Sequence, residues 1–217
     1  LRLVDSSGKI RERTTFESSA GQVAGGAAQS TTLIVSVGRP AGLDVEQIGK
    51  RPGYPRDQFR AAHVENVRDL PSRWFGYEAV DFLVLCSDNP QVVEDMDLAA
   101  RSALESWVRH GGHLVVSVGT SWERVTSVLG QMLPADIHGT ETVRQLSDLE
   151  SYLGQNSPPI RLIDPLSVPL FTNLRGQVLV GSKDLPLAVK GAYGFGTVAL
   201  VALEVSREPF VNWDVRT

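Results

Sequence analysis

The 217-residue chain has a single cysteine, no basic cluster and no long apolar run, and each of these features excludes a class of protein. One cysteine excludes an internal disulfide framework and any zinc site built from cysteines. The net charge of −4, without a cluster of Lys and Arg, argues against nucleic acid as the partner. Because no apolar stretch reaches about 18 residues, we predict no membrane span within these limits.

The chain also lacks the glycine-rich motifs that bind dinucleotides or present a catalytic serine. Gly191–Gly196 contains G-x-G but no G-x-G-x-x-G, and a strand rather than a helix follows it. We therefore predict a turn between antiparallel strands at this position, and we predict no cofactor and no metal site. Ser117 is not the centre of a G-x-S-x-G elbow, because residue 115 is valine.

The composition is that of a soluble globular protein, with 42% hydrophobic and 21% charged residues. Residues 1–16 contain two short extended runs around a turn, which predicts a β hairpin. Residues 17–30 are rich in Gly, Ala and Ser, as linkers are. We therefore divide the chain into an N-terminal extension with its linker, 1–30, and an α/β domain, 31–217. Since the chain begins at Leu1 without methionine, we expect it to be an excised or processed piece of a longer protein.

Four apolar runs predict strands that are buried on both faces, as parallel sheets require. These runs are Thr31–Val37, Phe59–Val67, Val80–Cys86 and Leu114–Val118. Between the last two, apolar residues from Met96 to Val108 recur at three- and four-residue spacing, which predicts an amphipathic helix. Gly111 and Gly112 should end that helix. A right-handed crossover then makes the two flanking strands parallel.

Beyond Pro134 the pattern changes to short runs separated by turn residues. We expect a short helix that starts at Ser147, and strands near 160–163, 177–181, 185–190 and 196–205. Their spacing favours antiparallel pairing at one edge of the sheet. The sequence therefore predicts an α/β protein whose sheet is mostly parallel, with antiparallel strands at the C-terminal edge.

Cys86 is the first candidate for chemistry, because it ends a predicted strand where open α/β sheets place their ligands. A nucleophilic cysteine needs a lowered pKa and a nearby base. Asp88 follows two residues later. Four histidines are also available, none at a spacing that ties it to the cysteine: His63, His110, His113 and His138. The alternative interpretation is a buried small hydrophobe, since free cysteine is among the most buried residue types.

The loop after the fourth predicted strand is the second candidate. It leads into a predicted helix, whose free backbone N–H groups and dipole can bind an anion or a carboxylate. Ser117, Gly119, Thr120 and Ser121 are the predicted ligand-binding residues. The alternative is an ordinary loop whose glycine the turn requires, with Thr120 and Glu123 forming a capping box.

Three stretches carry a family resemblance: LPSRWFGYEAVDFLVL, WVRHGGHLVVSVG and GAYGFGTVALVALEVSREPFVNW. Together they resemble the class I glutamine amidotransferase-like domains of large bacterial membrane-associated proteins, over roughly residues 31–213. The W-V-R-x-G-G motif before a strand also recurs in the trimerisation domain of some β-galactosidases. The resemblance implies a flavodoxin-like, three-layer, doubly wound fold. It also implies that the fragment is the soluble, extracytoplasmic or membrane-tethered part of its protein.

The sequence departs from the catalytic members of that superfamily at the nucleophile. Those members place a cysteine in a G-x-C-x-G elbow after the strand that here ends at Val118, with a His-Pro-Glu-type partner later. This chain has Ser117, Val118 and Gly119 there and no His-Pro-Glu, and Cys86 ends the preceding strand. The resemblance therefore implies a non-catalytic domain that binds a small ligand or a protein partner. The alternative is a cysteine-dependent hydrolase that uses Cys86 with a histidine and Asp88.

Overall fold

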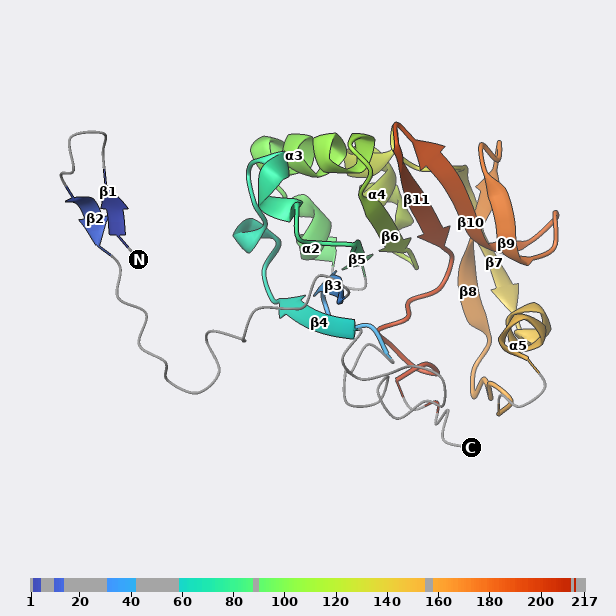
Figure 1. Ribbon diagram of the computed structural model, residues 1–217. Coiled ribbons are helices and arrows are strands. Elements are labelled where there is room, and N and C mark those ends of the chain that lie inside the picture. The colour runs from blue at the N-terminus through green and yellow to red at the C-terminus, as the bar shows by residue number, and fades with distance from the viewer. Residues whose placement is uncertain are drawn as a thin grey trace. The chain divides into compact units, whose positions relative to one another are not determined.

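The computed structural model describes residues 2–4, 10–13, 31–41, 59–87, 90–154, 158–211 and 213 (Figure 1). The chain divides into two units, Leu1–Thr31 and Thr32–Thr217. In the first unit, β1 (Arg2–Val4) pairs antiparallel with β2 (Ile10–Arg13). The predicted turn between them and the predicted linker lie outside the described residues.

The second unit is built on a seven-stranded sheet in the order β4-β3-β5-β6-β11-β10-β9. Its strands are β3 (Thr32–Val37), β4 (Phe59–Val64), β5 (Phe82–Cys86), β6 (His113–Ser117), β9 (Gln177–Gly181), β10 (Pro186–Tyr193) and β11 (Gly196–Val201). The first five in sheet order run parallel, and β10 and β9 add antiparallel neighbours at one edge. This confirms the predicted α/β, flavodoxin-like fold with an antiparallel C-terminal edge.

The helices of this unit follow the strands they connect. Those within the described ranges are the short 3-10 helices η2 (Val67–Asp69) and η3 (Trp74–Tyr77) and the α-helices α2 (Pro90–Glu94), α3 (Leu98–Arg109), α4 (Trp122–Leu129) and α5 (Ser147–Leu153). The Asp97 carboxylate caps α3 by accepting a hydrogen bond of 2.6 Å from the Ala100 N–H. Gly111 follows the helix with a φ of 122°, a conformation that favours glycine, so the predicted stop is confirmed.

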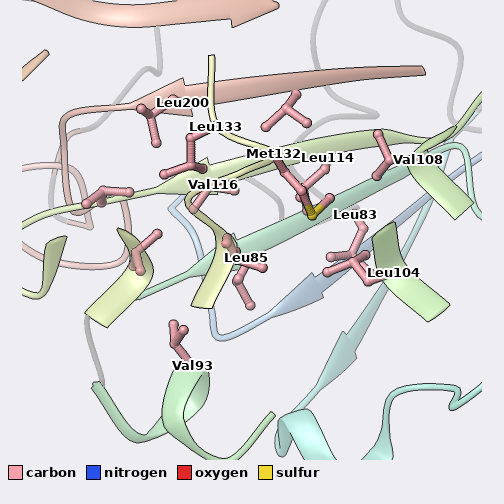
Figure 2. Packing of buried hydrophobic residues seen from close by; sticks show 14 of the residues in the cluster. Leu83, Leu85, Val93, Leu104, Val108, Leu114, Val116, Met132, Leu133 and Leu200 are labelled. Atoms are coloured by element: carbon pink, nitrogen blue, oxygen red, sulfur yellow. The ribbon is translucent and has the colours of Figure 1, made fainter. Parts of the chain in front are cut away.

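One face of the sheet, called here the helix-covered face, carries the main core (Figure 2). Figure 2 shows strand residues Leu83, Leu85, Leu114, Val116 and Leu200 packed together with helix residues Val93, Leu104 and Val108. Each of these side chains is at most 1% exposed. Burial on this scale, at about 25 cal/mol per Å² of apolar surface, is the dominant favourable term in folding.

The opposite face, called here the second face, is built from the alternate residues of the same strands. Strand register places Ser36 beside Val84 and Cys86 beside Ser117, so these side chains point to the same side of the sheet. At the amino end of this face Phe82 remains 39% exposed. At the carboxyl end Ser36, Cys86 and Ser117 are buried. The second face is thus open at one end and closed at the other.

The region after Pro134 differs from the prediction in three strands, one that is absent and two that were not predicted. No strand forms at 160–163, whereas β7 (Asp136–Val143) and β8 (Leu166–Thr172) form a separate antiparallel pair. The sequence DIHGTETV of β7 is largely polar and most of its residues are exposed, so a search for apolar runs misses it. This pair, α5 and the antiparallel edge share a second hydrophobic core around Leu146, Val168 and Leu203.

Two predicted boundaries also move. The strand predicted over Phe59–Val67 ends at Val64, because Asn66 accepts a hydrogen bond from Arg68 N–H and starts η2. The strand predicted over 196–205 ends at Val201, after which the chain turns across the carboxyl end of the sheet.

Candidate functional site

Three parallel strands end at the same level, and this carboxyl edge holds the residues that the sequence singled out. Cys86 of β5 is in register with Ser117 of β6, and Ser117 with Val201 of β11. The Ser87 N–H and hydroxyl both donate to the Ser117 carbonyl, at 3.1 and 2.9 Å. On the other side the Val118 N–H donates to the Val201 carbonyl at 2.8 Å. The edge is therefore tied together by backbone hydrogen bonds.

Cys86 lies at this edge outside any disulfide, and it is 0% exposed. A thiol without solvent exposure is not accessible to a substrate or an alkylating reagent in the folded protein. Asp88, its predicted companion, lies outside the described residues.

The four histidines that were considered as bases for Cys86 lie in separate places. His110 follows α3, where its Nδ1 lies 2.7 Å from the Ser106 carbonyl and its ring stacks on Trp74. His113 begins β6, at the end of the strand opposite to the edge, and its Nδ1 lies 2.9 Å from Thr197 Oγ1. His138 is exposed on β7.

His63 is the histidine at the carboxyl side of the sheet. It lies on β4 in register with Ser36 of β3, and its Nδ1 is 2.6 Å from the Ser36 hydroxyl. The same hydroxyl donates to the Gly38 carbonyl at 3.1 Å, which leaves the imidazole Nδ1–H to donate to Ser36. Ser36 is 1% exposed whereas His63 is exposed, so the hydrogen bond joins a buried hydroxyl of β3 to an exposed ring on the edge strand β4.

Ser117 ends β6, the strand after which the sequence analysis looked for a nucleophile elbow. Its hydroxyl donates to the Leu203 carbonyl at 2.6 Å and accepts from the Val205 N–H at 3.2 Å. The side chain is 1% exposed. Both hydrogen-bonding functions of the hydroxyl are thus used to hold the segment that follows β11.

The loop at Gly119 and Thr120 holds a carboxylate that the chain itself supplies. The Thr120 N–H and hydroxyl both donate to Glu204 Oε1, at 2.9 and 3.1 Å. Glu204 Oε2 also lies 3.3 Å from an Arg207 guanidinium nitrogen, and its side chain is only 14% exposed. A Cβ at position 119 would overlap the Glu204 carboxylate, so this close approach requires glycine.

This contact corrects the predicted capping box. Thr120 donates to Glu204 rather than capping α4, and Ser121 is the N-cap residue without a side-chain capping bond. Three of the four predicted ligand-binding residues, Ser117, Gly119 and Thr120, contact the segment that contains Leu203, Glu204 and Val205. The anionic group at this loop is therefore the Glu204 carboxylate of the same chain, a contact that the sequence analysis did not predict.

Tyr193, Glu105 and Arg109 form a hydrogen-bonded cluster at the opposite end of the sheet. The Tyr193 hydroxyl donates to Glu105 at 2.6 Å, and Arg109 lies 2.9 Å from the same carboxylate oxygen. The Tyr193 hydrogen bond, followed by the Arg109 interaction, lowers the pKa of Glu105. Arg109 also lies 5.0 Å from the centre of the Tyr193 ring. This cluster joins α3 to β10 and is a structural contact.

Two kinds of feature are not found in the described part of the chain. Within it, no cluster of three or more His, Cys, Asp and Glu side chains is arranged to hold a metal ion. No helix in the described ranges combines the length and the apolar character needed to cross a membrane.

Comparison with known proteins gives similarity in structure only. No protein-family model and no curated protein sequence matches the chain. Cytoplasmic protein STM1381 from Salmonella typhimurium LT2 has a TM-score of 0.55 and 17% identity, over 84% of this chain and 94% of that chain. Cytoplasmic protein STM3548 from Salmonella typhimurium has a TM-score of 0.53 and 13% identity, over 84% and 93%.

A ThuA-like protein from Bacteroides uniformis has a TM-score of 0.44 and 14% identity, over 84% of this chain and 85% of that chain. At these identities the two Salmonella matches show the fold alone and carry no activity with them. The second unit of the chain thus shares its α/β architecture with the two Salmonella proteins.

Proposed function

We propose that this protein is a non-catalytic amidotransferase-like domain that binds a small ligand or a protein partner as part of a larger membrane-associated protein. One observation carries the proposal: the loop that would need an exposed nucleophile instead presents a buried serine and a glycine covered by Glu204. A nucleophile must reach the substrate and must have a base within hydrogen-bond distance. The Ser117 hydroxyl is already used twice in backbone contacts.

Hydrolysis of glutamine by the purified protein tests the proposal. We expect no ammonia release above that of a Cys86→Ser variant, because the nucleophile elbow is missing from the sequence. The matched control is Ser117→Ala, which should fold with moderate loss of stability and should also leave the background rate unchanged. A rate that exceeds background and disappears in Cys86→Ser would refute the proposal.

The second candidate is a cysteine-dependent hydrolase that uses Cys86 with a histidine and Asp88. The position of Cys86 at the carboxyl end of β5 favours it, since ligands of open α/β sheets bind at this edge. This candidate predicts a thiol that alkylates rapidly with iodoacetamide at neutral pH. Burial of Cys86 predicts the opposite, namely alkylation at the rate of global or local unfolding. Fast alkylation of the folded protein would favour the hydrolase.

A ligand at Ser117, Gly119, Thr120 and Ser121 remains part of the proposal, with one added condition. Any external anion that binds the Thr120 N–H has to displace the Glu204 carboxylate, which already accepts from it. A small anion should therefore bind this loop weakly unless Glu204 is neutralised or removed.

A further inference from the structure

A cavity of about 570 Å³ lies between the irregular segment before β8 and the chain beyond β11. Residues of the stretch 158–166 form one wall, and Glu208, Pro209 and Trp213 form the other. None of the residues predicted from the sequence as ligand-binding contributes to the lining. The volume lies within the range of about 300–1,000 Å³ that is usual for sites of small molecules. The cavity is therefore a separate place where a small ligand can bind.

Contacts within the chain hold the walls of this pocket in place. The Trp213 indole N–H donates to the Pro158 carbonyl at 3.0 Å and so ties the two walls together. The Ile160 N–H donates to Glu150 Oε1 at 2.6 Å, which anchors the first wall to α5. Three lining side chains also pack against the second hydrophobic core: Leu162, Leu166 and Trp213. A pocket that is formed in advance loses little conformational entropy when a ligand binds.

Arg161 and Asp164 place two opposite charges in the same lining. Both residues are exposed, and within the described part of the chain neither side chain has an ion pair or a hydrogen bond. Arg161 offers a planar set of N–H donors that matches a carboxylate, and Asp164 offers an acceptor for an ammonium group. The third charged lining residue, Glu208, already interacts with other residues of the chain. The charges that remain for a ligand are therefore one positive and one negative.

This balance of charge selects against ligands of a single sign. A cation would meet Arg161 and an anion would meet Asp164, whereas a ligand with both a carboxylate and an ammonium group complements both. Apolar groups supply the rest of the lining. Ile163 is 89% exposed, so an apolar ligand body would cover surface that water now contacts. Four lining prolines have no backbone N–H and contribute mainly apolar contacts: Pro158, Pro159, Pro165 and Pro209.

We infer that this pocket binds a small zwitterion with an apolar body, the chemistry shared by free apolar amino acids and short apolar peptides. The carboxylate of the ligand accepts from Arg161, and its ammonium group donates to Asp164. Its apolar body packs on Ile163 and Trp213. The inference goes beyond the proposed function, because it concerns a site apart from the Gly119 loop. Its failure would leave the prediction on glutamine hydrolysis untouched.

Calorimetric titration of the whole chain with four probes tests this inference. The probes are leucine, Leu-Leu, acetyl-Leu-Leu, which lacks the ammonium group, and Leu-Leu-amide, which lacks the carboxylate. We expect saturable binding of Leu-Leu and about fivefold weaker binding of each blocked peptide, since each loses one ion pair. In a ¹H–¹⁵N spectrum the Trp213 indole signal, assigned with Trp213→Phe, should shift with Leu-Leu. Leucine that binds as tightly as Leu-Leu assigns the pocket to a free amino acid, and weaker binding of leucine assigns it to a peptide.

Single-charge variants identify which residue holds which end of the ligand. Arg161→Gln should weaken binding of Leu-Leu about fivefold and abolish the further effect of amidation. Asp164→Asn should do the same for acetylation. The matched controls, Arg144→Gln and Asp184→Asn, change exposed charges outside this pocket and should leave binding unchanged. The inference would be overturned by no saturable binding at millimolar concentration, equal binding of free and blocked peptides, an unmoved Trp213 signal, or equal effects of pocket and control variants.

Discussion

The two faces of the seven-stranded sheet are built from alternate residues of the same strands, yet the helices of the described ranges that belong to the main core pack on one of them. On the helix-covered face, Leu85 and Val116 are fully buried. Their chain neighbours on the second face, Val84 and Val115, are only partly buried. The apolar character of a strand residue is therefore a poor guide to its burial in this protein. The burial of a strand residue depends on whether another element packs on its side of the sheet.

The two faces also differ in role, since one carries the main core and the other carries the residues of the candidate site. The helix-covered face carries aliphatic side chains along its whole length, and packing explains them. The second face carries Ser36, Cys86 and Ser117 at its carboxyl end. Small polar side chains there allow the chain after β11 to approach closely, as the hydrogen bond from Ser117 to the Leu203 carbonyl shows.

The largest predicted difference between the faces lies on β5. There, removal of the smaller side chain, Leu85, should cost more unfolding free energy than removal of the larger one, Phe82. Leu85→Ala removes a 0% exposed side chain from the helix-covered face and should cost about 3 kcal/mol of unfolding free energy. Phe82→Ala removes a larger side chain that is 39% exposed and stacks on His113, and it should cost about 1 kcal/mol. Urea denaturation with equal slopes measures both values. A larger loss for Phe82→Ala would contradict the assignment of the faces.

Alkaline pH offers a second test of the helix-covered layer. Burial raises the pKa of Tyr77 to about 12, with a smaller contribution from the Asp97 charge. Because the folded-state pKa lies above the unfolded value near 10, the stabilisation is complete below about pH 10 and is lost as pH rises toward 12. The shift corresponds to a loss on the order of 2 kcal/mol. Tyr77→Phe should remove this part of the pH dependence, and an unchanged pH profile would contradict the burial of this phenol.

Neighbouring valines on β6 give the most closely matched pair. Val116→Ala should lower the unfolding free energy by about 2 kcal/mol, because it leaves a cavity among fully buried side chains. Val115→Ala, the same chemical change one residue away on the second face, should cost less than about 1 kcal/mol. Equal costs in urea denaturation would show that the second face is sealed as well.

Glu204→Gln should lower the unfolding free energy by about 1 kcal/mol, because the amide oxygen can still accept from Thr120 while the charge is lost. Thr120→Val is the matched change on the other partner and removes only the hydroxyl contact. A double-mutant cycle in thermal unfolding gives the coupling between the two side chains. Additive losses would mean that they do not interact.

Parallel strands and the α3 helix could be predicted from the sequence, because both depend on patterns within one segment. The apolar run that ends at Cys86, the spacing from Met96 to Val108 and the glycine at 111 each act locally. By contrast, β7 could not be found, since its polar sequence is stabilised by pairing with β8.

The residues that meet at the candidate site are determined by the order of the strands in the sheet. No local sequence pattern specifies that order. Glu204 follows β11, and it meets Thr120 only because β11 lies beside β6. In the same way, His63 meets Ser36 because β4 pairs with β3. Had the strand order been known, a carboxylate just after β11 could have been placed near the loop after β6. The capping-box prediction was wrong because this distant carboxylate takes the Thr120 hydroxyl.

The central claim is that the chain fills its own anion-binding loop, and thermal unfolding in phosphate tests it most directly. Ligand that binds the folded state raises its apparent stability in a saturable way. We predict that Glu204→Ala gains a saturable rise in Tm with phosphate that the unmodified protein lacks, measured against matched sodium chloride. An equal saturable rise in both proteins, or none in Glu204→Ala, would contradict the claim.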